Sequence, residues 1–307
     1  MAKKIYDSII IGAGPAGLSA AIYARRAGLG VLVFDREVWG GKTVNTSEIA
    51  NYPTILNISG PEFAMKLYEH ALGLGAEINI ESVLEVTLGD KEKRIKTDQG
   101  EYFAKTVIIA NGVARRNLEV PGEQEYTGRG VSYCATCDGV FFKDKEIFIV
   151  GGGNSALEEA LFLANSCSKV SMLHRNDSFK GDQILVDRVM ANPKIEVVFN
   201  AQVKEIIGTD KVEEIRVLHI DTGEEKLYKK DGIFVAIGYA PENQIFAEQL
   251  EIADPGYIVA DENCITNLPG VFACGDTRTK ELRQIVTAAS DGAMGGFRAA
   301  QYILLES

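Results

Sequence analysis

Short apolar runs alternate along this chain with glycine-rich turns and with segments of helical periodicity. The first run, 8–11, leads into Gly12-Ala-Gly14-Pro-Ala-Gly17, an Ala-rich helical stretch to Arg26 and a second apolar run, 31–34. A run of four to eight apolar residues bounded by turn residues is typical of a buried strand. The order therefore predicts strand, tight turn, helix and parallel strand, which is the repeating unit of a doubly wound α/β sheet.

The same order recurs about 140 residues later. An apolar run at 147–150 leads into Gly151-Gly-Gly153-Asn-Ser-Ala156, a helix at 157–165 and a strand at 169–173. Two such units predict two Rossmann-like dinucleotide-binding domains, each with a three-layer α/β architecture. Period-2 or continuous apolar patterns predict further strands at 77–85, 94–96, 106–110, 195–199, 203–207, 214–219, 232–237 and 270–274, and a closing helix at 284–305.

Two segments that contain both Pro and Gly, 117–122 and 238–243, mark the crossings between the two domains. The chain after the second crossing is too short to bury its own apolar face, so we expect it to rejoin the first domain. The second domain, 118–243, would then be inserted between two parts of the first, 1–117 and 244–307.

Composition narrows the class of protein. The chain has 43 acidic and 32 basic residues among 307, which gives a net charge of −11. Nucleic acids and anionic membranes are bound by basic surface, so we expect neither as a partner. No membrane span or signal peptide is evident, and five cysteines form no secreted disulfide framework, so we expect a cytoplasmic protein.

The first glycine motif lies where a dinucleotide fingerprint requires it, after a strand and at the start of a helix. Gly12, Gly14 and Gly17 allow a tight turn, close approach of a pyrophosphate and close packing of the helix. Asp35 ends the second strand, where a carboxylate accepts hydrogen bonds from an adenosine ribose. The motif favours FAD, and the alternative is a glycine-rich turn that binds no ligand.

The second motif differs where its second strand ends. Gly151, Gly153 and Ala156 repeat the turn, but His174-Arg175, with Lys180 nearby, stand in place of the acid. Cations there favour a ribose 2′-phosphate, which a carboxylate would repel. The motif favours NADPH, and the alternative is a structural duplication with an empty site.

The segment Cys134-Ala-Thr-Cys137-Asp138 carries the candidate chemistry of the chain. Two thiols three residues apart can close a reversible disulfide, and one of them can act as an attacking thiolate. Asp138 is placed to carry the proton that thiol chemistry needs. A zinc site or an inert pair are the alternatives, although the chain has no second CxxC and its three histidines are distant in sequence.

A last motif, Gly275-Asp276, follows an apolar strand and precedes Arg283-Gln284, where the last helix is predicted to start. A carboxylate at a strand end can bind the ribityl hydroxyls of a flavin, and a helix N-terminus can stabilise charge on the reduced ring. A plain turn and helix cap is the alternative.

In this order, the motifs resemble those of the low-molecular-weight thioredoxin reductases of bacteria and archaea. The resemblance covers nearly the whole chain. It implies a homodimer that passes electrons from NADPH through FAD and a Cys134–Cys137 disulfide to thioredoxin, with Cys137 nearer the flavin, Cys134 as the attacking thiol and Asp138 as the proton carrier. The residues implied for FAD are Gly12, Gly14, Gly17, Asp35, Gly41, Lys42, Asn51, Gly112, Gly275, Asp276, Arg283 and Gln284, and those for NADPH are Gly151, Gly153, Asn154, Ser155, Ala156, His174, Arg175, Lys180 and Gly238.

The chain departs from the family pattern in places. The family's HRR-xxx-R run has Asn176 and Lys180 where two arginines are usual, and Lys42 and Asn111 replace the usual Gln and Thr near the flavin. The weaker phosphate site leaves open a reductase fed by ferredoxin or another donor that is not a nicotinamide. The motifs also leave open a dithiol oxidase that passes electrons to oxygen, and a flavin-binding sensor without thiol turnover.

Overall fold

The computed structural model describes residues 4–46, 49, 51–89 and 91–306, and it divides into two compact units. Unit 1 comprises Met1–Ala114 and Ala240–Ser307, and unit 2 comprises Arg115–Tyr239. Where the chain passes from one unit to the other, β7 (Ala114–Arg115) pairs with β16 (Tyr239–Ala240). Unit 2 therefore begins and ends three to four residues before the boundaries expected from the sequence.

Unit 1 is built on a seven-stranded sheet in the order β3-β2-β1-β6-β5-β4, with β19 paired to β6. The parallel part contains β1 (Ile5–Ile11), β2 (Val31–Asp35), β3 (Glu77–Ile80), β6 (Glu101–Ile109) and β19 (Val271–Ala273). An antiparallel edge is formed by β4 (Val83–Thr87) and β5 (Lys93–Thr97). The carboxyl ends of β1, β2 and β19 thus lie on one edge of the sheet, where an open α/β sheet binds its ligands.

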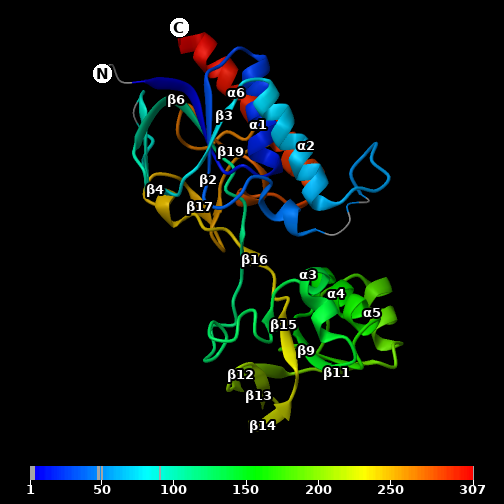
Figure 1. Cartoon of the computed structure of the whole chain (residues 1–307). Helices are drawn as coiled ribbons and strands as arrows, with labels where there is room; N and C mark the ends of the chain where they lie inside the picture. Colours follow the sequence, from blue (N-terminus) through cyan, green and yellow to red (C-terminus); the bar gives the residue numbers. More distant parts are fainter. Residues whose placement is uncertain (1–3, 47–48, 50, 90, 307) are drawn as a thin grey trace. The chain divides into compact units, whose positions relative to one another are not determined.

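Alternate residues of these strands belong to two separate hydrophobic cores, one on each face of the sheet. Ile10 and Ile108 lie in a cluster with α1 (Pro15–Arg26) and α6 (Ile285–Glu306), whereas Ile9 and Ile11 lie in the cluster of the opposite face. This is the expected consequence of the two-residue repeat of a strand. Helices α1, α2 (Gly60–Gly73) and α6 lie together on one side of the sheet (Figure 1).

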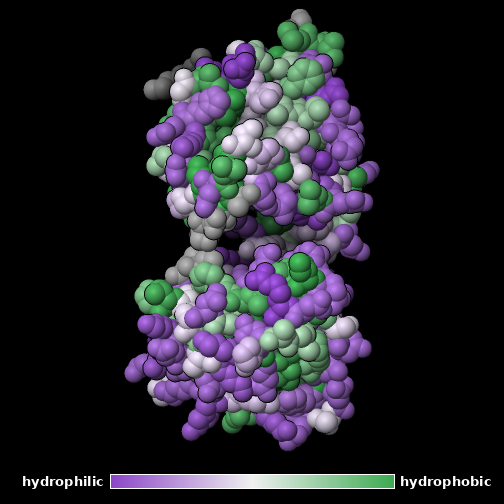
Figure 2. Space-filling view, turned by 90° about the vertical axis from the view of Figure 1, so that its right-hand side faces the viewer, coloured by the Kyte–Doolittle hydropathy of each residue, from purple (hydrophilic) through white to green (hydrophobic). Residues whose placement is uncertain are grey.

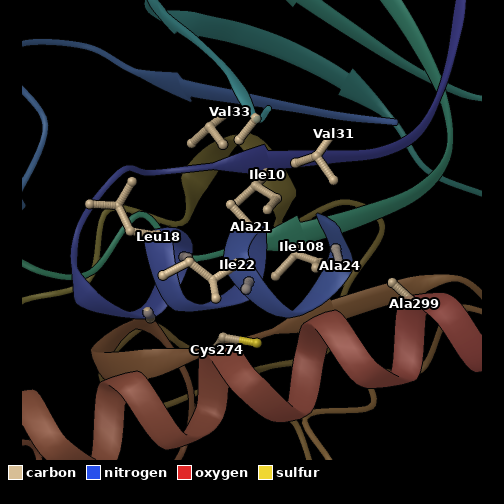
Figure 3. Packing of buried hydrophobic residues seen from close by; sticks show 14 of the residues in the cluster. Ile10, Leu18, Ala21, Ile22, Ala24, Val31, Val33, Ile108, Cys274 and Ala299 are labelled. Atoms are coloured by element: carbon tan, nitrogen blue, oxygen red, sulfur yellow. The ribbon is translucent and has the colours of Figure 1, made fainter. Parts of the chain in front are cut away.

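Helices α1 and α6 approach each other so closely that only glycine fits between them. A Cβ on Gly292 would lie 2.0 Å from the carbonyl oxygen of Ala16, and one on Gly296 would lie 2.5 Å from that of Ala20. Figure 3 shows the packed residues of this core, with Ala24 of α1 and Ala299 of α6 among them. The small residues of α1 and α6 therefore set the distance between the two helices.

The shorter elements of unit 1 lie around the sheet edge and on its other face. They are η1 (Gly41–Asn45), η3 (Gln244–Phe246), β17 (Ile252–Ala253), β18 (Tyr257–Ile258) and η4 (Gly275–Thr277). Phe246 and Ile258 are fully buried in the core of the second face.

Unit 2 contains a five-stranded parallel sheet in the order β11-β10-β9-β15-β8. One core packs it against α4, and another packs it against an antiparallel sheet, β12-β13-β14, so the unit has three layers (Figure 1). Its elements are β8 (Val131–Ser132), α3 (Ala135–Asp138), η2 (Gly139–Phe142), β9 (Glu146–Val150), α4 (Asn154–Ala164), β10 (Lys169–Leu173), α5 (Gln183–Met190), β11 (Ile195–Val198), β12 (Ala201–Gly208), β13 (Val212–His219), β14 (Glu224–Lys229) and β15 (Gly232–Val235).

The predicted fold class is confirmed, and most predicted strands lie within two residues of those observed. The single strand expected at 77–85 is wrong, because the chain pairs first with β2 in β3 and then leaves it to pair with β5 in β4. Glu81 stands at this change of partner, where its side chain accepts hydrogen bonds from Thr97 Oγ1 at 2.7 Å and Tyr102 Oη at 2.9 Å. Helices α2 and α5 were not predicted.

Candidate active site

The turn after β1 has a geometry that only glycine can adopt. Gly12 has a φ of 106°, and a Cβ on it would lie 2.3 Å from the carbonyl oxygen of Ala110. A Cβ on Gly17 would lie 1.8 Å from the carbonyl oxygen of Gly12. Beside Gly14 there is space, since its Cβ would meet nothing nearer than the Cα of Gly41 at 3.9 Å. The close contacts at Gly12 and Gly17 shape the turn, and the space beside Gly14 leaves room for a ligand.

Helix α1 starts at this turn with Gly14 as its N-cap and Pro15 as its first residue. Within the described chain, no side chain caps this end and no acidic residue lies in the first turn of the helix. The partial positive charge of a helix N-terminus is therefore not neutralised locally, as a pyrophosphate site requires.

Asp35 lies at the end of β2 and holds the turn. Its Oδ2 accepts a hydrogen bond from Ala13 N at 2.7 Å, and its Oδ1 accepts one from Glu37 N at 3.3 Å. Burial raises the pKa of this carboxyl, while the backbone hydrogen bonds oppose the rise. A carboxylate has about four lone-pair positions, and the backbone N–H groups of Ala13, Arg36 and Glu37 occupy three of them, so Asp35 can still accept a hydrogen bond from a ribose hydroxyl.

Asp276 in η4 carries the clearest sign of a ligand in unit 1. Its Oδ1 is buried and has no hydrogen-bond partner among the described residues. Burial raises the pKa of Asp276, and the positive charges of Lys280, Arg283 and Lys42 oppose the rise. Buried polar atoms are nearly always hydrogen-bonded in proteins, so an unpartnered one here fits a hydroxyl supplied by a cofactor.

Sequence reasoning missed the residue that holds this turn in place. Asp291 on α6 accepts a hydrogen bond from Gly275 N at 2.9 Å, a bidentate pair from Arg278 at 2.8 and 3.0 Å, and one from Lys280 Nζ at 2.9 Å. Burial alone would raise the pKa of Asp291, but these partners hold it below its ordinary value. An acid within an Ala- and Gly-rich helix was the available signal, because such a residue needs a partner when that face is buried.

A second support of η4 was also missed. Asn243 donates hydrogen bonds to the carbonyl oxygens of Gly256 at 2.9 Å and Thr277 at 3.2 Å, and it accepts one from Thr277 Oγ1 at 2.9 Å. Asn111, for which no role was predicted, donates to Asn243 Oδ1 at 3.1 Å. Asn111 thus links η4 to the strand end that precedes Gly112, whose φ is 67°.

The other residues predicted for FAD gather around the same edge. Arg283 lies with its guanidinium 3.9 Å from the ring centre of Tyr257. Asn51 Nδ2 donates to Gln284 Oε1 at 3.0 Å, which ties the chain after η1 to the start of α6. Gly41, at the start of η1, has a φ of 54°. Unit 1 therefore brings its predicted set together, and the space at Gly14, the uncapped helix and the unpartnered Asp276 fit an FAD.

The glycine turn after β9 in unit 2 has the same features, a glycine at positive φ in close contact and a second glycine beside open space. Gly151 has a φ of 151°, and a Cβ on it would lie 2.3 Å from the carbonyl oxygen of Ala236 and 2.7 Å from the Cβ of Ala156. Gly153 is the N-cap of α4, and nothing lies within 4 Å of the position its Cβ would take. Residues 154–155 at the start of α4 are exposed, so the helix N-terminus is open to a nucleotide.

Two further residues of this predicted set have structural partners. Asn154 Nδ2 donates to Asp182 Oδ2 at 3.0 Å, and its Oδ1 accepts from Asp182 N at 2.7 Å. Gly238 has a φ of 91°, and its carbonyl oxygen accepts from Arg116 N at 3.0 Å. Asn154 therefore holds the start of α4 in place, and Gly238 allows a sharp turn at the start of the second crossing.

His174 lies beneath the glycine turn, and it does not line the pocket described next. A Cβ on Gly152 would lie 2.3 Å from its Cε1, so the ring packs directly on that glycine. Burial is the main cause of a lowered pKa for His174, and the charges of Arg175 and Lys180 add to it. A neutral ring that shapes the turn is the role that this geometry supports.

Arg175 and Lys180 line an open pocket of about 560 Å³ at the end of β10. Neither side chain forms a hydrogen bond or ion pair with the part of the chain that the structure describes. Lys180 N donates to the carbonyl oxygen of Gly152 at 2.8 Å, which places the pocket beside the glycine turn. Two uncommitted cations at this position fit the phosphate groups of NADPH.

The CxxC segment lies between β8 and η2 of unit 2. Cys134 is disulfide-bonded, and it precedes the short helix α3. Ser132 Oγ donates to Asp138 Oδ2 at 2.6 Å and accepts from Cys134 N at 3.1 Å, so one hydroxyl connects the cysteine to the acid. The side chain of Cys137 lies outside the described residues, and the pairing of Cys134 with Cys137 therefore stays a prediction.

Glu159 on α4 is another residue that sequence reasoning missed. Its Oε2 is buried without a hydrogen-bond partner among the described residues. Burial is the main cause of a pKa raised to about 7, which Glu158 raises further and Arg115 opposes. A carboxyl that titrates near neutrality is suited to proton transfer.

Two further findings concern the described residues as a whole. They contain no group of three His, Cys, Asp or Glu residues that could hold a metal ion. They also include no helix that is long and apolar enough to cross a membrane.

On the face that Figure 2 shows, hydrophobic residues are scattered in small groups among hydrophilic ones.

Comparisons with known proteins show the family to which the chain belongs. The family model of the pyridine nucleotide-disulphide oxidoreductases matches residues 6–292. The thioredoxin reductase of Listeria monocytogenes is 44% identical over 302 residues, which cover 98% of this chain and 95% of that protein. The structure of Lactococcus lactis thioredoxin reductase matches with a TM-score of 0.90 at 40% identity, over 98% of this chain and 99% of the other. A ferredoxin-flavin thioredoxin reductase from Clostridium acetobutylicum matches with a TM-score of 0.55 at 31% identity, over 99% and 100%.

The chain belongs to the pyridine nucleotide-disulphide oxidoreductase family. Within that family, the predicted resemblance to low-molecular-weight thioredoxin reductases is confirmed. The predicted enzyme class and cofactors are confirmed with it: the protein is a flavoprotein oxidoreductase that uses FAD and NADPH.

Proposed function

We propose that this protein is a cytoplasmic, homodimeric thioredoxin reductase. It takes electrons from NADPH and delivers them, through FAD and a Cys134–Cys137 disulfide, to the disulfide of thioredoxin or a thioredoxin-like protein. The observation that carries the proposal is the disulfide at Cys134, with Ser132 and Asp138 bound beside it, in the unit that also bears the nucleotide pocket. The identity to curated thioredoxin reductases over almost the full chain supports it.

In this proposal the cofactors are held by the residues described above. The α1 turn, Asp35 and Asp276 hold FAD, while the α4 turn and Arg175 hold NADPH. When bound, the two cofactors supply the two-electron transfer that protein side chains cannot perform. The fold provides positions for them, and the thiol chemistry belongs to the chain itself.

The thiol steps follow from disulfide exchange. Reduction of the disulfide uses two electrons and yields two thiols, one of which must lose a proton before it can attack. Cys134, as a thiolate, attacks a sulfur of the partner's disulfide and forms a mixed disulfide. The partner's other sulfur leaves as a thiolate and takes up a proton. Cys137, deprotonated in its turn, attacks the Cys134 sulfur of the mixed disulfide, which re-forms the Cys134–Cys137 disulfide and releases the partner as a dithiol with both electrons. Asp138 takes and returns the proton, and its hydrogen bond from Ser132 Oγ at 2.6 Å keeps the carboxylate next to Cys134.

Serine substitutions at the two cysteines test the relay. Cys134→Ser and Cys137→Ser should each abolish turnover with a thioredoxin-type protein disulfide, and both variants should stay yellow because the FAD residues of unit 1 are unchanged. The matched control is Cys167→Ala, a buried free cysteine of the same unit, which should keep its turnover. Full turnover in either serine variant would show that the relay is wrong.

A reductase fed by ferredoxin is the second candidate. It is favoured by Asn176, which stands where the family pattern has a phosphate-binding arginine, and by the likeness to the ferredoxin-flavin thioredoxin reductase. Anaerobic mixing with NADPH separates the two candidates. Bleaching of the flavin by NADPH supports the first, and bleaching only by reduced ferredoxin supports the second.

A further inference from the structure

The nucleotide pocket of unit 2 has one wall that lies outside the two motifs already described. The turn between β13 and β14 contributes Asp221, which is 46 residues from Arg175 in the sequence. Asn200, with a φ of 51°, fastens this turn to the loop after β10. Its carbonyl oxygen accepts from Ile220 N at 2.7 Å, and its own N donates to the carbonyl oxygen of Asn176 at 3.2 Å.

The side chain of Asp221 is fixed by the same residue. Asn200 Nδ2 donates to Asp221 Oδ2 at 2.9 Å. The amide is neutral, so this bond positions the carboxylate without cancelling its charge. Among the described residues, Asp221 forms no ion pair.

The pocket therefore holds charges of both signs. Arg175 and Lys180 are its cations, and Asp177 and Asp221 are its carboxylates. Asp177 Oδ1 accepts a hydrogen bond from Ser178 Oγ at 3.0 Å, which also leaves its charge in place. Two positive and two negative charges cancel, whereas a site that selects a phosphate needs an excess of positive charge.

The two nicotinamide donors differ only at the adenosine ribose. NADPH carries a 2′-phosphate with a charge near −2, and NADH carries a neutral hydroxyl. A carboxylate in the pocket repels the phosphate and has little effect on the hydroxyl. Its presence therefore shifts the choice of donor toward NADH without any new contact.

We propose that Asp221 is a specificity-determining residue that lowers the preference of this chain for NADPH, so that the pocket accepts NADH as well. The inference rests on the proposed function, since it assumes that the pocket receives the adenosine end of a nicotinamide donor. It deepens that function because it assigns part of the donor choice to a turn of the antiparallel sheet.

The test compares Asp221→Asn with Asp210→Asn. Asparagine keeps the shape of Asp221 and removes its charge. Asp210 lies in the β12–β13 turn, at the other end of the same sheet. Eight residues of β13 separate the two ends, which is about 25 Å and well beyond the screening length at moderate salt. The control therefore makes the same change in net charge without changing the pocket.

Dissociation constants for NADP⁺ and NAD⁺ are measured by calorimetry on the FAD-loaded oxidised protein, at low and high salt. Asp221→Asn should bind NADP⁺ about two- to tenfold more tightly, because an exposed charge pair contributes up to about tenfold when the phosphate is doubly charged. NAD⁺ binding should stay within about twofold, Asp210→Asn should match the wild type, and high salt should shrink the gain.

Unchanged NADP⁺ affinity in Asp221→Asn would overturn the inference and leave the proposed function intact, provided that the wild type binds both nucleotides. A gain of equal size in Asp210→Asn would also overturn it, because net charge alone would then explain the effect. If the wild type binds neither nucleotide, the NADPH-dependent function fails, and the inference fails with it.

Discussion

The buried acid of α6 allows a direct test of how unit 1 holds its cofactor turn. Asp291→Asn keeps the size of the side chain and removes the negative charge that faces Arg278 and Lys280, whose side chains are 4% and 8% exposed. Removal of one partner from a buried ion pair costs about 3–5 kcal/mol, because the remaining charge stays buried and unpaired. That is a large part of a typical free energy of unfolding of about 5–15 kcal/mol.

The assay is urea unfolding followed by circular dichroism, together with the release of FAD followed by its fluorescence. Asp291→Asn should lose about 3–5 kcal/mol of unfolding free energy and release FAD more readily, because Gly275 N loses a charged acceptor at 2.9 Å. The matched control is Glu101→Gln, which breaks an exposed pair with Arg94 and should cost about 0.2–1 kcal/mol. If Asp291→Asn is as stable as this control and retains FAD equally well, the network does not hold the turn.

Three further variants test the buried acid of α4, the nucleotide pocket of unit 2 and the packing of α1 against α6. Glu159 has a pKa of about 7 against an ordinary 4.5, so the folded chain keeps a proton that the unfolded chain has lost, and stability should fall by roughly 1–3 kcal/mol as pH rises from about 5 to 8. Glu159→Gln should remove that fall in urea titrations, and an unchanged pH profile would contradict the assignment. Asn176→Arg should widen the preference for NADPH over NADH by about tenfold in steady-state kinetics, since a charge-assisted hydrogen bond is added, and an unchanged ratio would place the residue outside the phosphate site. Gly292→Ala should lower the free energy of unfolding by about 1–3 kcal/mol, because its Cβ would lie 2.0 Å from the carbonyl oxygen of Ala16, whereas Gly73→Ala, with nothing within 4 Å, should be neutral or stabilising.

The features that sequence analysis predicted well are those that local geometry dictates. Gly12 and Gly151 stand at positive φ between a strand and a helix, and few other residues could occupy these positions. The two fingerprints, their strands and the edge at which they open were therefore readable from spacing alone. The cations at 175 and 180 were readable in the same way, because the position after the second strand has a fixed place beside the turn.

The residues that sequence analysis missed depend on contacts between distant segments. Asp291 acts on Gly275 across 16 residues, and Asn243 acts on Thr277 across 34. Asp221 lines the pocket from a turn that Asn200, 21 residues away, binds through hydrogen bonds. No local sequence pattern distinguishes such residues from other polar ones, because their partners come from distant segments of the chain.

Helix α2 was missed for a different reason, because it had a local signal. Ser59, followed three residues later by Glu62, forms the start of a capping box, and Ser59 Oγ accepts a hydrogen bond from Glu62 N at 3.3 Å. Pro61 near the start of the helix is a second indication. The helix could therefore have been predicted from its first turn.

An anaerobic titration shows whether NADPH electrons reach a disulfide through FAD. The purified yellow protein is titrated with NADPH while flavin absorbance and free thiols are recorded. FAD and one disulfide each take two electrons, and NADPH supplies two, so full reduction should need two equivalents per chain and expose two new thiols. Those thiols should be absent in Cys134→Ser. Bleaching complete after one equivalent with no new thiols, or no bleaching at all, would show that this electron path from NADPH to the disulfide is wrong.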